Sequence, residues 1–262
     1  VMGGDGYVGY FGFPAPSINS AGRYNWDKRS WYGDMFTTNY LTTMNAWREI
    51  RKAINNDEDP RFSMAQILKV AAMHRVTDTY GPIPYLNFGV SKEVPYDSQK
   101  DVYYRFFEEL DGAINNLDSY AASGSKVLSS WDCVFNGDVT SWIKFANSLR
   151  LRLALHLAYV DETKEKSEAQ LAIGNSYGLM NVKSDLAELQ HITPIATYES
   201  PLYILKGWDD ICMGATLDSY MNGYQDPRLS AYFEAGTGGK YRGIRAGMSK
   251  DVSKDKYITG IF

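Results

Sequence analysis

Carboxylates are the first side chains to weigh for chemistry, because hydrolysis of a glycosidic bond uses two acids that face each other across a cleft. The chain holds 31 Asp and Glu residues, with adjacent pairs at Glu108–Glu109 and Asp209–Asp210. Neighbouring residues on a helix point in different directions, so an adjacent pair there does not face across a cleft. A pair assembled from distant positions would leave no pattern, and an all-α glycoside hydrolase therefore stays open as an alternative.

Other catalytic and metal-binding patterns are missing from the sequence. The histidines His74, His156 and His191 are isolated, and Cys133 and Cys212 form no CxxC pair. The run GTGGKY at residues 236–241 lacks the glycine spacing of a phosphate-binding loop and the Ser or Thr after its lysine. We therefore predict that the protein is not an enzyme and that it has no cofactor and no metal site.

Aromatic residues are the unusual part of the composition, and they favour binding over catalysis. There are 20 Tyr, 6 Trp and 11 Phe, which make up 14% of the chain. Tyr and Trp offer flat apolar faces with a polar edge, and the C–H faces of sugars pack on such rings. Most of these rings are expected in the core. Those in irregular segments are candidate ligand-binding residues: Trp26, Trp31, Tyr32, Tyr198, Tyr203, Trp208 and Tyr241, with Asp209 and Arg242 as hydrogen-bonding partners.

Charge and hydropathy exclude some classes of partner and place the chain among globular proteins. The net charge is −4 and no basic cluster occurs, so we predict no nucleic-acid binding. The sequence shows no signal peptide, lipobox cysteine or membrane-spanning run. Because it starts in a glycine-rich segment and ends without a closing element, we expect it to be part of a longer precursor.

Apolar residues at helical spacing predict a succession of helices over about residues 34–174. One helix is expected at about 34–56, and the next begins at Ser63, where Gln66 completes a capping-box pattern. Gly81 and Pro82 end that second helix. Further helices are predicted from Asp97 or Ser98, over about 138–159 and over 165–173.

The character of the sequence changes near residue 175. Short apolar runs there alternate with Gly, Pro and Asn, which predicts long irregular loops with a few short helices or strands. Within this part, Asp226 is expected to cap a short helix that has Pro227 at its first position. Long irregular segments in a compact protein are usually functional, so this part is a candidate ligand-binding region.

Three stretches, in the same order along the chain, resemble the SusD/RagB family of outer-membrane nutrient-binding lipoproteins. They are YGPIPY with YDSQKDVYYRFFEELDGAINNL (residues 80–117), FNGDVTSWIKFANSLRLRLALHLA (135–158), and NGYQDPRLSAYF with YRGIRAGM (222–248). No single stretch is diagnostic, but the colinear set is specific. None of the stretches identifies a ligand-binding position, because the family's ligand residues lie in variable loops.

The resemblance implies a mainly α fold of tetratricopeptide-like helix pairs stacked in an array, with long irregular loops and few short strands. It implies one SusD-like domain over residues 1–262, incomplete at both ends, with a helical core at about 34–174 and a loop-rich segment at about 175–262. No clean 34-residue repeat is found in the sequence itself.

The same resemblance implies a function. The protein is expected to bind an oligosaccharide or polysaccharide without cleaving it and to deliver it to a SusC-like TonB-dependent transporter. Its expected location is the cell outer membrane, as a surface-exposed lipoprotein whose lipid anchor lies upstream of Val1. A helical-repeat scaffold or importer subunit that binds peptides remains an alternative to glycan binding.

Overall fold

The computed structural model describes residues 8–13, 31–91, 93–189, 203–204, 207 and 211–246. The chain divides into two compact units, one of residues 30–196 and one of residues 1–29 together with 197–262. Each unit has its own hydrophobic core. That the two units belong to the single domain predicted over residues 1–262 stays a prediction.

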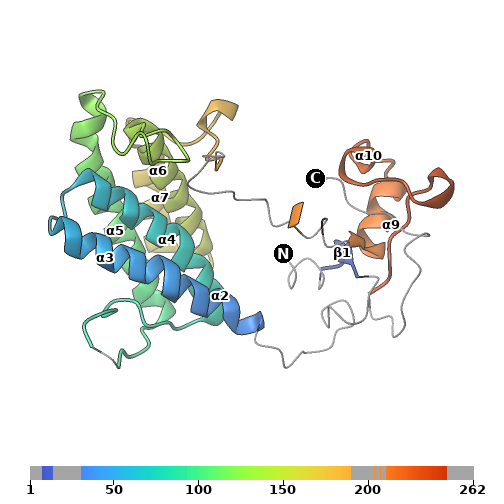
Figure 1. The fold of residues 1–262 in the computed structure, drawn as a ribbon, viewed down its shortest axis with the longest axis horizontal. Helices are drawn as coiled ribbons and strands as arrows, with labels where there is room; N and C mark the ends of the chain where they lie inside the picture. The colour runs from blue at the N-terminus through green and yellow to red at the C-terminus, as the bar shows by residue number, and fades with distance from the viewer. Residues whose placement is uncertain are drawn as a thin grey trace. The chain divides into compact units, whose positions relative to one another are not determined.

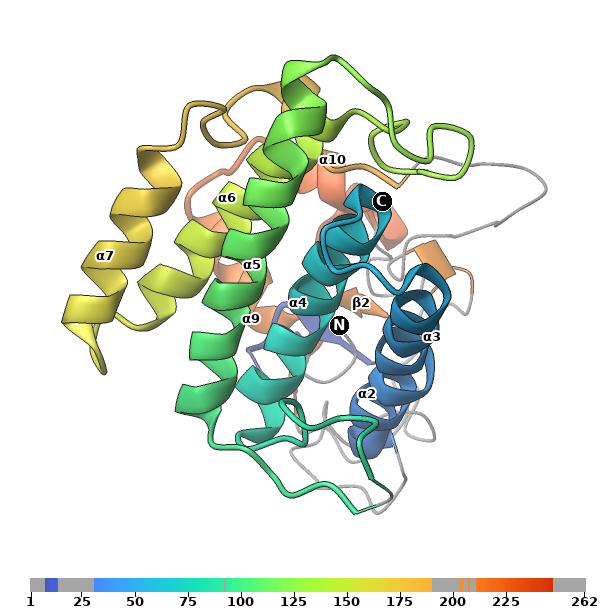
Figure 2. The same ribbon diagram turned by 90° about the vertical axis from the view of Figure 1, so that its left-hand side faces the viewer.

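The first unit is a stack of helices (Figure 1). Its elements are α2 (Trp31–Asn39), the π-helical turn η2 (Tyr40–Met44), α3 (Asn45–Ile54), α4 (Pro60–Tyr80), α5 (Gln99–Ala122), α6 (Val139–His156), α7 (Glu162–Ile173) and the 3₁₀ turn η3 (Lys183–Asp185). Successive helices pack side by side, α3 on α4, α4 on α5, α5 on α6 and α6 on α7 (Figure 2). This arrangement confirms the predicted mainly helical fold built from stacked helix pairs.

The core of the helical unit is built from the apolar stripes of α4, α5 and α6. Ile67 and Val70 of α4, Phe106 and Leu110 of α5, and Ile143 of α6 are all buried. These residues fall at helical spacing in the sequence, which explains why periodicity alone located the three helices. This packing contributes most of the stability of these helices, because in proteins the packing of an amphipathic face outweighs intrinsic helix propensity.

Capping side chains set the helix starts, and the starts predicted at residues 34, 63 and 165 are each three residues too late. Ser98, one of the two predicted starts, caps α5 by accepting the Asp101 N–H (3.1 Å). Asp138, where the next helix was expected to begin, caps α6 by accepting the Ser141 N–H (3.2 Å). The helix expected to begin at Ser63 begins at Pro60, where Asp59 accepts the Arg61 N–H (2.8 Å). Pro60 causes the earlier start because its fixed φ suits the first helical position, where no N–H is needed.

In its described residues, the second unit contains a two-stranded antiparallel sheet and the short helices α9 and α10. Strand β1 (Phe11–Gly12) pairs with β2 (Cys212–Met213), with Phe11 opposite Met213. The chain then forms α9 (Ala215–Gly223), α10 (Leu229–Tyr232) and the 3₁₀ turn η4 (Thr237–Gly239). Phe11, Ile211, Met213, Met221 and Phe233 form its small buried core.

Candidate functional site

The nine residues predicted to bind ligand fall into three groups. Trp26, Tyr198, Trp208 and Asp209 lie outside the described residues, and Trp31 and Tyr32 form the first turn of α2. The remaining three belong to the second unit, where Tyr203 and Arg242 are exposed and Tyr241 packs against the small core. The structure thus gives Tyr241 a supporting position, and the binding roles of all nine stay predictions.

Close backbone packing holds α9 against β1. The Gly214 N–H donates to the Tyr10 carbonyl (2.8 Å), and the Ala215 N–H donates to the Ile244 carbonyl (2.8 Å). A Cβ at Gly214 would lie 2.2 Å from the carbonyl oxygen of Gly9. Only glycine allows this approach, so Gly214 fixes how the N-terminal strand meets α9.

Replacing Gly214 by alanine is expected to destabilise the second unit by about 1–3 kcal/mol, because the new methyl group would overlap backbone atoms. Hydrogen exchange at the Gly214 and Ile244 amides would report the loss locally. Gly223→Ala on the same helix is the matched control, since a Cβ there meets nothing within 4 Å. The control should leave exchange unchanged or slow it. Equal protection in both variants would contradict the proposed role of the close approach.

A groove lined by tyrosines lies on this unit, beside the strand and the two helices. It encloses about 590 Å³, and its lining residues are Tyr10, Phe11, Leu217, Tyr220, Met221, Tyr224, Asp226, Arg228, Tyr232 and Phe233. The buried Phe11, Met221 and Phe233 form an apolar floor, whereas the four tyrosines are exposed. We call this feature the tyrosine groove. Its volume falls within the range of small-molecule binding sites.

Two of the four tyrosines, Tyr220 and Tyr224, form an exposed pair of rings. They stand four residues apart at the C-terminal end of α9, on one helical face. Their ring centroids are 6.3 Å apart, and the ring planes differ by 14°. Tyr220 is 62% exposed and Tyr224 is 81% exposed. Exposed aromatic rings grouped around an apolar hollow typically mark an interaction site.

An ion pair fixes the polar edge of the groove. Asp226 accepts the Arg228 backbone N–H (2.9 Å) and the Arg228 Nε–H (2.9 Å), and Arg228 Nη2 contacts its other oxygen. The hydrogen bonds from the Arg228 side chain lower the pKa of Asp226 to about 2. The predicted helix start at Pro227 is wrong: α10 begins at Leu229, and Pro227 and Arg228 lie in the turn before it.

Sequence reasoning missed Tyr10, Tyr220, Tyr224 and Tyr232. The spacing of Tyr220 and Tyr224 by one helical turn was a usable signal. Tyr10 carried no such signal, because its place depends on a strand pairing between opposite parts of the chain.

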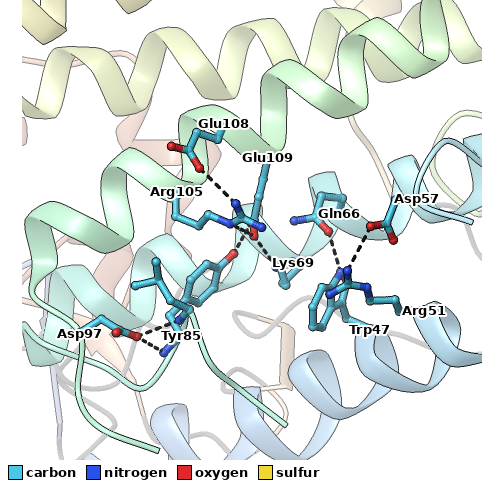
Figure 3. Close-up of polar contacts among 11 residues, drawn as sticks. Trp47, Arg51, Asp57, Gln66, Lys69, Tyr85, Asp97, Arg105, Glu108 and Glu109 are labelled. Atoms are coloured by element: carbon cyan, nitrogen blue, oxygen red, sulfur yellow. Dashed lines mark hydrogen bonds and ion pairs between the residues drawn. The ribbon is translucent and has the colours of Figure 1, made fainter. Parts of the chain in front are cut away.

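A second cleft, between α3, α4 and α5, covers a buried polar network (Figure 3). At its centre Lys69, only 2% exposed, donates to Glu109 (2.9 Å). Glu109 also accepts the Tyr85 hydroxyl (2.5 Å) and the Arg105 Nε–H (3.1 Å). Burial lowers the pKa of Lys69 to about 8 and raises that of Tyr85 well above its usual value.

The contacts of this cleft support a structural role. Lys69 Nζ lies 3.8 Å from the ring centroid of Trp47, so a face of that ring is already covered. The indole N–H of Trp47 donates to Gln66 (2.7 Å), and Arg51 pairs with Asp57 (3.0 Å). The cleft encloses about 260 Å³, which is below the usual size of a ligand site. Its aromatic face and its polar groups therefore serve the packing of the three helices.

A third cavity, of about 610 Å³, lies at the ends of α4, α5 and α6. Its polar groups bond to one another: the Tyr103 hydroxyl donates to Asp78 (2.5 Å) and lies 2.9 Å from His156 Nδ1. The neighbouring half-buried Tyr104 donates to Asp161, and Lys100 and Lys164 lie 5.3 and 5.2 Å from its ring centroid. The tyrosine groove thus differs from these two cavities in having exposed tyrosine rings.

Within the described ranges, no group of three or more His, Cys, Asp or Glu could hold a metal ion. No helix in those ranges is long and apolar enough to cross a membrane.

Comparison with known proteins gives the family. Over residues 1–260 the chain matches the SusD-like family model, described as the Susd and RagB outer membrane lipoprotein. The chain belongs to the SusD-like family. This membership confirms the resemblance found in the three sequence stretches, and with it the outer-membrane lipoprotein localisation.

Solved SusD-like structures resemble this chain along nearly its whole length. A SusD homologue from Bacteroides vulgatus is 32% identical with a TM-score of 0.86, and the match covers 98% of this chain and 53% of that one. A chitin-binding SusD homologue from Flavobacterium johnsoniae is 33% identical with a TM-score of 0.84, covering 97% and 54%. A SusD homologue from Bacteroides uniformis is 31% identical with a TM-score of 0.73, covering 100% and 56%.

The SusD-like chain therefore spans about half the length of the solved structures it matches. Their likeness also confirms the predicted mainly α fold of the family. No curated protein sequence matches the chain.

Proposed function

We propose that this SusD-like protein captures glycans at the cell surface and passes them, uncleaved, to a SusC-like TonB-dependent transporter. The observation that carries the proposal is the tyrosine groove, in which exposed rings surround an apolar floor. The chitin-binding relative from Flavobacterium johnsoniae supports a carbohydrate as the ligand.

The groove suits reversible binding rather than hydrolysis. Sugar C–H groups pack on ring faces, and tyrosine hydroxyls and the Asp226–Arg228 pair offer partners to sugar hydroxyls. Cleavage of a glycosidic bond needs a second carboxylate across the site. Asp226 is the acid among the described lining residues, and it is held by Arg228. The function we propose therefore requires no bond chemistry.

The nine residues predicted from the sequence belong to the proposal as a second part of the ligand-binding surface. They are Trp26, Trp31, Tyr32, Tyr198, Tyr203, Trp208, Asp209, Tyr241 and Arg242. A lipid anchor upstream of Val1 would hold the protein at the membrane.

Native affinity electrophoresis through gels that each contain one polysaccharide tests the proposal, with reducing-sugar release assayed in parallel. We expect retardation by at least one glycan and no release of sugar. Release of sugar would show an enzyme instead. Binding to peptides with no retardation by any glycan would overturn the choice of ligand and support the peptide-binding alternative.

A further inference from the structure

We propose that the tyrosine groove selects neutral glycan chains and rejects acidic ones that carry carboxylate or sulfate groups. The inference rests on the proposed function and names the class of glycan that this site takes. It follows from the ring faces, the ion pair and the position of the nearest acid.

The ring faces disfavour anions. Tyr10, Tyr220, Tyr224 and Tyr232 line the groove and are all exposed. The face of an aromatic ring carries the negative part of its quadrupole, so it attracts the C–H groups of a neutral pyranose and repels a negative substituent. Rings that stack on a ligand with their faces therefore favour uncharged sugars.

The ion pair occupies Arg228, the cation among the groove's described lining residues that could attract an acidic sugar. Asp226 and Arg228 are the charged residues among the described lining residues. Arg228 directs Nε and Nη2 at the carboxylate of Asp226, in the two-pronged geometry that a ligand carboxylate would otherwise use. Because its low pKa keeps Asp226 ionised at any physiological pH, the pair stays neutral overall.

Nearby charges do not restore an attraction for anions. Asp218 of α9 lies one turn before Asn222 and accepts the Gly243 N–H (2.8 Å), which places a fixed negative charge on the helix that carries the tyrosine pair. The exposed cations Lys240 and Arg242 are not among the residues that line the groove. The groove therefore presents rings, hydroxyls and a closed ion pair to its ligand.

The test compares neutral and acidic oligosaccharides of equal length by titration calorimetry, with chitin hexasaccharide and hexagalacturonate as the probes. The wild-type protein is expected to bind the neutral probe at least about tenfold more tightly, which is a modest difference in binding free energy. Asp226→Asn leaves Arg228 without its partner, so the affinity ratio should shift toward the acidic probe by about fivefold.

A matched control is Asp185→Asn in the helical unit. Asp185 pairs with Lys144 (2.8 Å), and this contact likewise lowers the pKa of Asp185 to about 2. The control removes a comparable carboxylate outside the groove and should leave the affinity ratio unchanged. If Asp226→Asn does not fold, Arg228→Gln serves instead. In that variant the negative charge of Asp226 has lost its partner, so binding of the acidic probe should become weaker than in the wild type.

The outcomes separate this inference from the proposed function. A wild-type protein that prefers the acidic probe overturns the neutral selectivity while glycan capture stands. An affinity ratio that does not change in Asp226→Asn or Arg228→Gln also overturns it. Binding of neither probe, with no retardation by any polysaccharide, removes the proposed function itself.

Discussion

Glu109→Gln is expected to lower the free energy of unfolding by about 3–5 kcal/mol, because it leaves the charge of Lys69 buried without its counterion. Lys69 and Glu109 are 2% and 6% exposed, and both lie inside the helical stack. Glutamine keeps the shape of the side chain, so a loss of this size reports the missing charge rather than a cavity. Chemical denaturation followed by far-UV circular dichroism measures it.

The adjacent residue supplies the control. Glu108 is also on α5 and pairs with Arg105 (3.1 Å), but its side chain is 66% exposed. Exposed ion pairs contribute little, so Glu108→Gln should cost less than about 1 kcal/mol. If the two glutamine variants are equally destabilised, the buried network does not carry the stability that its geometry suggests.

The destabilisation should also depend on pH. Burial lowers the pKa of Lys69 to about 8, and Glu109 opposes that shift, so removing Glu109 lowers the pKa of Lys69 further. In the unfolded chain, Lys69 keeps a pKa near its ordinary value. Between the folded and the unfolded pKa of Lys69, the unfolded chain binds more protons, so the free energy of unfolding rises with pH in that range. The gap in stability between wild type and Glu109→Gln should therefore be widest below the lowered pKa of Lys69 in the variant, shrink as the pH rises to 8, and stay constant above pH 8.

Replacing Tyr220 and Tyr224 together with alanine is expected to weaken glycan binding by about a hundredfold. Each exposed ring should contribute about 1–1.5 kcal/mol of stacking, which adds up to a loss of that order. Since both side chains are exposed, the thermal unfolding midpoint should change little. Titration with the glycan that retards the wild-type protein measures the loss.

Two further variants make this experiment specific. Tyr159 is fully exposed on the helical unit and does not line the groove, so Tyr159→Ala should bind normally. Changing Tyr220 and Tyr224 to phenylalanine keeps the rings and should recover most of the affinity. Undiminished binding by the double alanine variant would place the glycan site elsewhere, with the nine residues predicted from the sequence as the next candidates.

Local features of the fold were predictable from the sequence, and features that depend on long-range contacts were not. The caps at Ser98 and Asp138 and the helices they begin are encoded within a few residues. The burial of Lys69 could not be foreseen, because its partner Glu109 stands on another helix. Lysine is rarely buried without a partner, so the residue type alone predicted that Lys69 would be exposed.

The groove we propose is a ring-based surface of the kind that the sequence predicted, but none of the nine predicted residues is among its described lining residues. An excess of tyrosine indicated ring-based binding, and the resemblance indicated a glycan. Tyr10 joins the rings of α9 and α10 through two-residue strands, and elements so short leave no alternation to recognise.

The pairing of β1 with β2 sets an order of events during folding. Phe11 pairs with Met213, so the two strands can meet only when a loop of about 200 residues closes. Closing that loop costs more conformational entropy than forming contacts between neighbouring helices. The helical unit consists of contacts between successive helices and can form before that long loop closes. The groove thus depends on a closure that the helices do not need, and a chain cut before Ile244 would carry complete helices without an assembled tyrosine surface.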